Sequence, residues 1–354
     1  MKASKKIISR TVALLFIGSL CITACKKNSE SNGSSSPTAK AIDPGEAKGG
    51  EVLTITGDGL SNITSIIFGK DSVPASFNPN FNTDNSILFR VPDTASGGTQ
   101  DIILTNSIGK QVKVAFNVIA LPSVTEVSNY NFSAGERLTL KGNNLKDVTA
   151  VKIKGTTTSA TIVSQSKKQL VITLPETTIN TGFLDITNST GTITTTQEFV
   201  NREVAYQIFT DNYGAGWENA SWGAASISST EFKSGSASFK AIYGKGNWSA
   251  NGFATWSIGF DYSPDYKFLA FWIKGGTKDN TYYITGDQRD GGYGNSDITA
   301  PVLVPANVWT YYKIPLATLK LWSKGTKSKQ LGFYIRGPEG EDQTIHFDDI
   351  LVVK

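Results

Sequence analysis

The stretch GEVLTITGDGL at residues 50–60 occurs a second time as GERLTLKGNNL at residues 135–145. The correspondence continues downstream, where LTNSIG at 104–109 matches ITNSTG at 186–191. Within each copy, apolar and polar residues alternate in short runs separated by Gly, Asn and Pro, which is the pattern of half-buried β-strands. The repetition therefore predicts two homologous β-sandwich domains, at residues 42–119 and 120–200.

The two repeats resemble a known family. The opening Gly-Glu-x-Leu-Thr-aliphatic-x-Gly-x-x-Leu, the strand that leads to Gly69 or Gly155 and the later Thr-Asn-Ser turn are similar to the IPT/TIG immunoglobulin-like family. Such domains form DNA-binding parts of some transcription factors and spacers in bacterial surface proteins, so the fold alone does not choose between these roles. Neither repeat contains tryptophan, and the N-terminal segment favours the spacer role.

The first residues predict export and anchoring. Four basic residues precede the apolar run 11–20, which is too short to span a bilayer as a permanent helix. The run leads to Ile22-Thr23-Ala24-Cys25, which resembles a bacterial lipobox. This resemblance implies a signal peptide at 1–24 and lipidation of Cys25, which would attach the protein to a membrane; an ordinary signal peptide with a coincidental cysteine is the alternative. The polar, Gly/Ser-rich segment 25–41 predicts a flexible tether.

Charge and cysteine content exclude several classes of protein. The chain has 34 basic and 30 acidic residues, and four of the basic residues lie in the signal peptide, so the mature chain balances at 30 of each. A balanced charge argues against a nucleic-acid partner, which would require a basic face. Of the two cysteines, Cys21 would be removed with the signal peptide and Cys25 lipidated, so we expect no disulfide and no zinc cluster.

Residues 203–354 differ in composition, because they hold all seven tryptophans. Alternating apolar runs predict strands and no long helix, and we expect an all-β jelly-roll sandwich here. The expected strands are 236–243, 253–260, 268–274, 281–287, 309–315, 330–336 and 344–353. The segments SGSASFK (234–240), LAFWIKGG (269–276), WTYYKIPL (309–316) and FDDI (347–350) are similar, in this order, to the β-jelly-roll carbohydrate-binding modules attached to glycoside hydrolases.

This resemblance implies a sugar site on the concave sheet, where aromatic faces stack on pyranose rings and polar groups take the hydroxyls. Alternation in 331–336 directs Leu331, Phe333 and Ile335 inward and leaves Tyr334 and Arg336 outside. The same logic turns Tyr283 and Asp287 outward. The resemblance adds the strands of Trp222 and Trp256 to this sheet. We expect the loop 244–251 to expose Trp248; the loop 287–295 is either part of the site or simply solvated. The candidate carbohydrate-binding residues are Trp222, Trp248, Trp256, Tyr283, Asp287, Arg289, Tyr293, Tyr334 and Arg336.

Three other tryptophans have different expected roles. We expect Trp217 and Trp309 in the core of the sandwich, and the resemblance assigns Trp272 to the opposite sheet. Related modules commonly bind a structural calcium ion through acids near the start and end of the domain. Asp211 and Asp348 match those positions, although Asp349 is an equal alternative to Asp348 and turn roles would also explain these residues.

The sequence gives little support for catalysis. The single histidine, His346, has no cysteine or nucleophile motif near it in the sequence, and a role in the strand is the simpler interpretation. A glycosidase pair could in principle come from four carboxylates, Glu231, Asp287, Glu339 and Glu341. Their spacing in the sequence does not single out one acid and one base. We expect no catalytic cofactor.

The order of lipid anchor, two spacers and terminal jelly roll resembles surface glycan-binding lipoproteins encoded beside outer-membrane glycan importers. The resemblance implies a non-catalytic protein on the outer membrane, exposed at the cell surface, that captures polysaccharide for a hydrolase and importer system. A β-glucan is the ligand suggested by the many aromatic residues and the balanced charge. A surface adhesin that binds a protein partner and a lipoprotein glycoside hydrolase are the alternatives, and a periplasmic orientation stays open.

Overall fold

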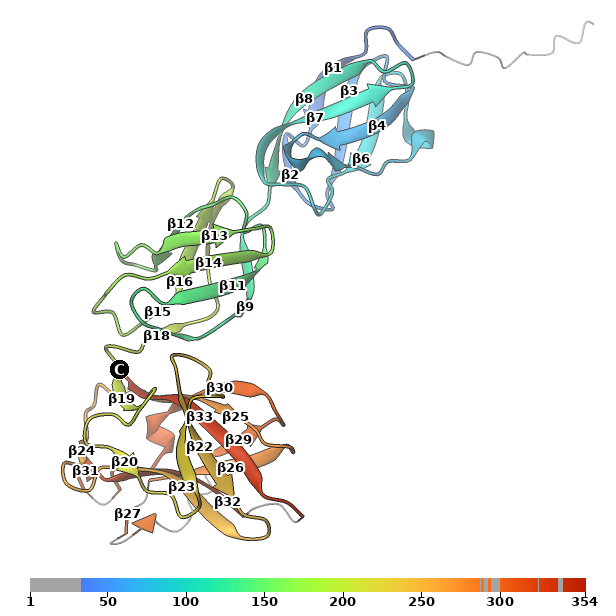
Figure 1. Ribbon diagram of the computed structural model, residues 1–354. Coiled ribbons are helices and arrows are strands. Elements are labelled where there is room, and N and C mark those ends of the chain that lie inside the picture. Colours follow the sequence, from blue (N-terminus) through green and yellow to red (C-terminus); the bar gives the residue numbers. More distant parts are fainter. Residues whose placement is uncertain (1–32, 287, 290–291, 294–299, 324, 337–339) are drawn as a thin grey trace, which may run out of the picture.

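The structure, a computed structural model, describes residues 33–354 except 287, 290–291, 294–299, 324 and 337–339. Three β-domains follow one another along the chain, as Figure 1 shows. The described residues form strands and three short 3₁₀ helices, which confirms the all-β prediction. Within these ranges, no helix has the length and apolar content that a membrane crossing requires.

The first domain is a sandwich of a three-stranded sheet, β1-β3-β6, and a five-stranded sheet, β2-β8-β7-β4-β5. Its strands are β1 (Thr38–Asp43), β2 (Glu46–Lys48), β3 (Val52–Asp58), β4 (Ile63–Phe68), β5 (Val73–Pro74), β6 (Ser86–Arg90), β7 (Gly98–Asn106) and β8 (Gln111–Ile119). The alternation read from the sequence holds, because Leu53 and Ile55 lie in the core with Phe68 and Phe116.

This domain begins earlier than the predicted tether allows. Residues 38–43 form β1, which pairs with β3, and Asn106 Nδ2 donates a hydrogen bond to Ser34 O at 2.7 Å. The polar residues before β1 are therefore bound to the domain through their own backbone groups. The composition of this segment alone does not reveal these bonds.

The second domain is a related sandwich whose strands fall into one four-stranded and two three-stranded sheets. Its strands are β9 (Ser123–Val127), β10 (Asn131–Phe132), β11 (Arg137–Asn143), β12 (Val148–Ile153), β13 (Thr161–Gln165), β14 (Gln169–Thr173), β15 (Thr181–Gly182), β16 (Leu184–Asn188), β17 (Gly191–Thr194) and β18 (Phe199–Asn201). The glycine shared by both repeat motifs has a physical reason: a Cβ on Gly57 or on Gly142 would overlap the carbonyl oxygen of Thr38 or Ser123, on the neighbouring strand. In both domains the pairing shifts register beside this close approach.

The third domain is a jelly-roll sandwich of two sheets. We call the sheet β21-β22-β33-β25-β30, with β19 paired to β33, the docked sheet, and the sheet β20-β23-β32-β26-β29 the open sheet. The docked sheet contains β19 (Tyr206–Phe209), β21 (Ala225–Ser228), β22 (Ser238–Tyr243), β25 (Phe268–Lys274), β30 (Trp309–Pro315) and β33 (Gln343–Val353); the open sheet contains β20 (Glu218–Asn219), β23 (Trp248–Ala254), β26 (Asn280–Thr285), β29 (Pro301–Val304) and β32 (Gln330–Arg336). Short pairs are formed by β24 (Phe260–Asp261) with β31 (Lys327–Ser328) and by β27 (Gln288–Arg289) with β28 (Gly292–Tyr293). Phe239, Phe271, Phe333 and Phe347 fill the space between the two sheets.

The docked sheet packs its outer face against the second domain (Figure 1). Ala270, Leu351 and Val353 of this face are buried in one apolar cluster with Val200 of β18. Beside the cluster, the ring of Tyr311 stacks on Tyr130, with 4.8 Å between ring centroids. Since one sheet face is used for the core and this one for docking, the outer face of the open sheet is left as the candidate binding face.

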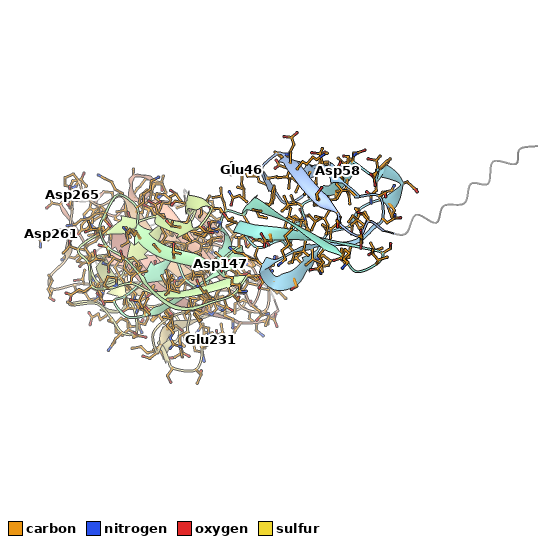
Figure 2. All side chains as sticks on the ribbon, turned by 90° about the horizontal axis from the view of Figure 1, so that it is seen from above. Glu46, Asp58, Asp147, Glu231, Asp261 and Asp265 are labelled. Atoms are coloured by element: carbon orange, nitrogen blue, oxygen red, sulfur yellow. The ribbon has the colours of Figure 1, made fainter. Side chains whose placement is uncertain are left out.

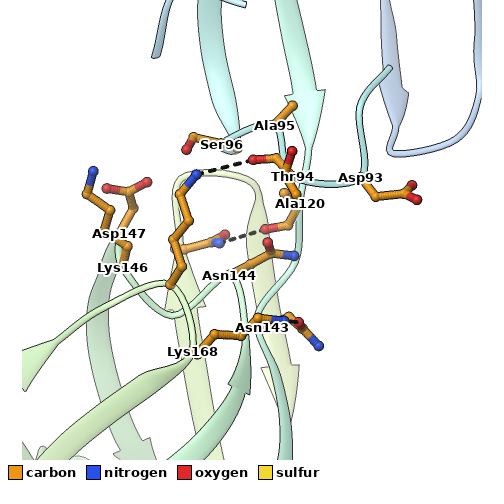
Figure 3. Close-up of a pocket in the computed structure, with 13 residues that line it drawn as sticks. Asp93, Thr94, Ala95, Ser96, Ala120, Asn143, Asn144, Lys146, Asp147 and Lys168 are labelled. Carbon is orange, nitrogen blue, oxygen red and sulfur yellow. Dashed lines mark hydrogen bonds between the residues drawn. The ribbon is translucent and has the colours of Figure 1, made fainter. Parts of the chain in front are cut away.

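The first and second domains meet through a more polar junction (Figure 3). Lys146 Nζ lies 2.7 Å from Asp71 Oδ1, and Asn188 Nδ2 donates to Ala120 O at 2.8 Å. These groups surround a cavity of about 90 Å³. Ion pairs between partly exposed side chains contribute little to stability, about 0–1 kcal/mol each, so this junction is weaker than the apolar one.

Candidate carbohydrate-binding face

The candidate site is built on three neighbouring strands of the open sheet. In the pairing register, Ala250 of β23 and Tyr283 of β26 lie on either side of Tyr334 in β32. Leu331, Phe333 and Ile335 lie in the core, as alternation predicts. Tyr334 is therefore on the opposite face, in a separate cluster with Ala250, Ala220 and Tyr283.

Three aromatic rings follow one another across this face. The ring of Tyr334 lies 6.1 Å from that of Trp248 and 5.5 Å from that of Tyr283, at interplanar angles of 34° and 33°. We call Trp248, Tyr334 and Tyr283 the aromatic row. Trp248 is 63% exposed, whereas the central Tyr334 is only 6% exposed because its neighbours cover it. The row thus combines an accessible indole with a tyrosine that packing already holds in place.

Small residues form the floor beside the row. Gly252 lies opposite Gly332, and Ala254 lies opposite Gln330 on the same face. The side chain of Gln330 is buried, and neither its Oε1 nor its Nε2 has a hydrogen-bond partner; the same holds for Thr285 Oγ1, whose residue pairs with Gly332. Buried polar groups without partners are uncommon and mark places where another polar group can bind.

Gln330 was not among the residues that the sequence nominated. The signal was present, because the alternation that turns Tyr334 outward also turns Gln330 outward. A glutamine at the first position of a predicted strand is an ordinary residue there, and burial of both amide atoms becomes evident only when β23 and β26 are placed beside it.

The remaining candidate tryptophans lie at the margins of the face. Trp222 is exposed in the segment between β20 and β21, and its backbone N–H donates to Ala250 O at 2.8 Å, which places it beside β23. Trp256 is exposed in the turn that follows β23, not within a strand of the sheet as the resemblance implied. Trp248 is exposed as expected, but it begins β23 instead of lying in a loop.

Four nominated residues have side chains outside the described part of the chain. Asp287 is one of the omitted residues. Arg289 lies in β27, Tyr293 in β28 and Arg336 at the end of β32, where only the backbone is described. Because β28 lies close to β32, the backbone brings this hairpin to the open sheet.

The tryptophans expected in the core divide into two cases. Trp217 is buried in the core, and its Nε1 donates to Tyr206 Oη at 3.1 Å. Trp309 is only half-buried, outside the core cluster, and donates from Nε1 to Glu231 Oε1 at 2.9 Å, so the expectation of a core role was wrong for this residue. Trp309 begins β30, which is the edge strand of the docked sheet, and an edge strand buries its side chains less completely.

Of the four carboxylates considered for catalysis, the two described ones, Glu231 and Glu341, are held by separate partners. The ammonium group of Lys274 lies 2.7 Å from Glu231 and is the main cause that lowers the pKa of this carboxyl. Glu341 accepts a hydrogen bond from Thr277 at 2.6 Å, and this bond lowers its pKa also. Asp287 and Glu339 lie outside the described residues. Figure 2 shows Glu231 well separated from Asp261 and Asp265 in the third domain.

Comparison with known proteins identifies the first two domains. Residues 37–116 and 122–200 each match the model of the IPT/TIG domain. The chain carries two tandem IPT/TIG domains. The two matched segments agree with the two sandwiches seen in the structure and with the resemblance read from the repeats.

The three-domain fold has counterparts among solved structures. A surface glycan-binding protein of Prevotella bryantii is 19% identical, with a TM-score of 0.52, over 91% of this chain and 99% of its own. An SGBP-B from a xyloglucan utilization locus of Bacteroides uniformis is 18% identical, with a TM-score of 0.41, over 90% of this chain and 99% of its own. No curated protein matches the sequence. The similarity to the Prevotella protein shows that the two chains share a fold over most of their length.

The junction between the second IPT/TIG domain and the jelly roll contains the acids expected to bind calcium. β33 has an irregularity at Asp348 and Asp349, where Asp349 adopts a φ of 46° and both side chains point away from the core. The linker residue Arg202 lies between the domains: its guanidinium is 3.2 Å from Asp349 and 3.0 Å from Glu136. Asp349 also accepts hydrogen bonds from Ser234 Oγ at 2.7 Å and Asn131 Nδ2 at 3.1 Å.

The calcium site stays a prediction, and in the structure protein donors bond to the expected ligand acids. Asp348 accepts hydrogen bonds from three backbone amides, those of Lys233, Ser234 and Asp349, and the carboxylate of Asp211 accepts from the amide of Ala237 at 2.9 Å. Burial, and after it the adjacent Asp349 carboxylate, raise the pKa of Asp348 to about 8. Among the described residues, no three acidic, histidine or cysteine side chains gather in one place. The described cation that pairs with Asp349 here is Arg202.

Proposed function

We propose that the protein captures a neutral polysaccharide on the outer face of the open sheet and does not cleave it. The observation that carries the proposal is the aromatic row beside a floor of alanine and glycine residues, on the sheet face that neither the core nor the second IPT/TIG domain uses. The shared fold with a surface glycan-binding protein supports it.

The chemistry of the face suits sugar rings. A pyranose presents C–H groups on its faces and hydroxyls around its edge, so it can stack on Trp248 and Tyr283 while its hydroxyls reach polar side chains. Gln330 can both donate and accept through its amide, and Thr285 adds a hydroxyl, so each would gain hydrogen bonds that it does not have in the free protein. Because packing already fixes Tyr334, the central ring would lose little conformational freedom on binding.

A β-glucan is the ligand class that we propose. The described side chains of the row and its floor carry no charge, which favours an uncharged glycan over an acidic one. We further propose that acyl chains on Cys25 hold the protein on the outer membrane with its binding face at the cell surface. In this position it would raise the concentration of captured chains near a hydrolase and an outer-membrane importer.

Affinity electrophoresis tests the proposal. The mature protein is run through gels that contain xyloglucan, mixed-linkage β-glucan, hydroxyethylcellulose or the acidic control polygalacturonate, and each polymer is assayed for new reducing ends. We expect retardation by at least one β-glucan without product. Release of reducing ends would indicate a glycoside hydrolase instead, and a folded protein that no polymer retards would favour a protein-binding adhesin.

A further inference from the structure

A second aromatic pocket lies outside the open sheet. It is a cavity of about 400 Å³ bounded by the turn after β24 and by the 3₁₀ helix η3 (Leu316–Thr318) with the residues that follow it. The aromatic residues that line it are Tyr262, Tyr266 and Trp322. Figure 2 shows Asp261 and Asp265, which flank this turn, together at the margin of the jelly roll. None of the lining residues belongs to the aromatic row or to the junction with the second IPT/TIG domain.

The walls of this pocket are held in place before any ligand arrives. Trp322 Nε1 donates to Phe260 O at 2.9 Å, and the indole packs on the buried Phe260 ring at 4.9 Å between centroids. Tyr262 meets Trp322 edge to face, at 5.5 Å and 77°, and is 57% exposed. The ring of Tyr266 also packs against Phe260, with 5.4 Å between the ring centroids. Two aromatic walls inclined at 77°, one of them anchored by a backbone hydrogen bond, form a corner that is open to solvent.

The pocket has the size and the rim of a small-molecule site. Ligand cavities typically measure about 300–1,000 Å³, and this one is at the lower end, which suits one sugar unit better than a chain segment. Ser263, Ser323 and Lys320 place polar atoms around the aromatic walls. A protein segment would more often require a broad apolar patch than a small corner with a polar rim.

Exposed apolar side chains connect the pocket to the end of the open sheet. After β23 ends at Ala254, Trp256, Ile258 and Tyr262 are all exposed within a short stretch of chain that leads to the pocket. A glycan that lies across the open sheet and leaves it at this end would therefore meet further apolar surface before it reaches the corner of Tyr262 and Trp322.

We propose that this pocket is a second carbohydrate subsite, which takes one neutral pyranose unit of a glycan whose main chain lies on the open sheet. The inference rests on the proposed function of the open sheet. Two subsites on one polymer act together, so the pocket adds affinity for long chains by making the second contact intramolecular.

Two variants and two controls test the subsite. Tyr262→Ala removes the exposed wall, and Ala317→Glu places a charged side chain at an exposed position of the pocket lining. Tyr262→Phe keeps the ring, and Phe81→Ala removes an aromatic residue of similar exposure, 64%, from the first domain. Binding to xyloglucan, mixed-linkage β-glucan and hydroxyethylcellulose is measured by affinity electrophoresis and calorimetry, and thermal unfolding checks that each variant is folded.

We expect Tyr262→Ala and Ala317→Glu to weaken polymer binding about three- to tenfold, the range for loss of one aromatic contact, while Tyr262→Phe and Phe81→Ala stay within about twofold of the parent. The inference is overturned if the two pocket variants bind like Phe81→Ala while Trp248→Ala has lost binding, because the open sheet would then account for all of the affinity. A parent protein that binds none of the polymers overturns the proposed function and this subsite together. If Tyr262→Ala unfolds, Ala317→Glu alone decides, since its position is exposed.

Discussion

At the scale of single residues, the same side chain type has opposite roles in one domain. Trp248 projects from the first position of β23 into solvent, whereas Trp217 is enclosed in the core with its indole N–H bonded to Tyr206. Composition alone shows that tryptophan is concentrated here, but only the contacts separate binding from packing.

Replacement of these two residues by alanine should therefore affect different properties, glycan binding for Trp248 and stability for Trp217. Trp248→Ala should weaken glycan binding by about 1–3 kcal/mol, as for anchor residues at other interfaces, with an unchanged melting temperature. Trp217→Ala should lower the free energy of unfolding by about 3–5 kcal/mol, because truncation of a buried aromatic leaves a cavity. Calorimetric titration and urea unfolding measure the two effects. Loss of binding in Trp248→Ala that occurs only through unfolding would contradict the assignment.

The unpartnered amide of Gln330 predicts that its replacement changes stability and glycan binding in opposite directions. Gln330→Leu should raise the free energy of unfolding by up to about 1–3 kcal/mol, the cost of a buried polar group without a partner, and should weaken glycan binding. Gln100→Leu is the matched control, because Gln100 is also buried but accepts a hydrogen bond from the backbone amide of Lys70. This control should be destabilised. Equal destabilisation of both variants would show that the Gln330 amide is satisfied in the folded protein.

His346, the single histidine, gives the stability a defined pH dependence. Burial lowers its pKa from 6.5, and the nearby Lys274 and Lys240 act in the same direction, while Glu231 opposes them. The folded state therefore favours neutral imidazole, and the unfolded chain binds the extra proton as the pH falls below about 6.5, so the contribution of His346 to the free energy of unfolding decreases there. Asp348 acts in the opposite direction, because its raised pKa makes the folded state bind a proton as the pH falls through about 8. We expect urea unfolding to show that the free energy of unfolding of His346→Gln rises relative to that of the parent as the pH falls from about 7.5 to 5.5. Parallel curves would contradict this prediction.

At the scale of elements, alternation predicted most of the jelly roll. The expected strands 268–274, 309–315 and 330–336 coincide with β25, β30 and β32, because each is an apolar run bounded by turn residues. The expected strand 253–260 was wrong: β23 covers 248–254, and a turn closed by a hydrogen bond from Gly259 N to Thr255 O follows it. The aromatic residues in this stretch continue an apparent strand pattern, so the backbone turn left no clear signal.

Sequence reasoning could not assign a partner to each sheet face. Alternation indicates that Ala270 and Trp272 point to opposite sides from Leu269 and Phe271, but it does not reveal that the second IPT/TIG domain covers them. Trp272 Nε1 donates to Asn129 Oδ1 at 2.8 Å across this junction, a pairing between residues far apart in the chain. The irregularity in β33 was equally hidden, because two adjacent aspartates are compatible with a metal site, a turn or an ion pair.

Arg202 predicts how strongly this junction depends on one ion pair. Arg202→Met keeps the length of the side chain but leaves Asp349, which is fully buried, without its cation, and breaking a buried pair costs about 3–5 kcal/mol. Lys141→Met, which breaks an exposed pair with Glu126, should cost no more than about 1 kcal/mol. Urea unfolding compares the two, and Asp349→Asn added to Arg202→Met should restore part of the loss. A similar cost for both single variants would argue against a buried charge at this position.

At the scale of the whole molecule, the two junctions predict different truncations. A fragment of residues 120–354 should bind glycan within about twofold of the parent, because the first domain contributes no described residue to the open sheet. A fragment of residues 203–354 should be less stable, since it exposes Ala270, Leu351 and Val353 to water. Calorimetry of both fragments with the β-glucan that retards the parent tests this. Equal melting temperatures for the jelly roll in both fragments would contradict the role given to the docked face.

The unequal junctions also have a mechanical consequence. Tension on a captured chain passes from the jelly roll into the second IPT/TIG domain through a packed, aromatic contact, and then reaches a polar contact between partly exposed side chains. The polar contact would separate first, so the jelly roll and the second IPT/TIG domain would move together. The pivot would then lie one full domain away from the binding face. Movement at this contact would carry the jelly roll and the second IPT/TIG domain through a wide range of positions, while the open sheet keeps a constant orientation relative to the second IPT/TIG domain. The protein would thus reach chains over a wide area without changing how the binding face is held on the second IPT/TIG domain.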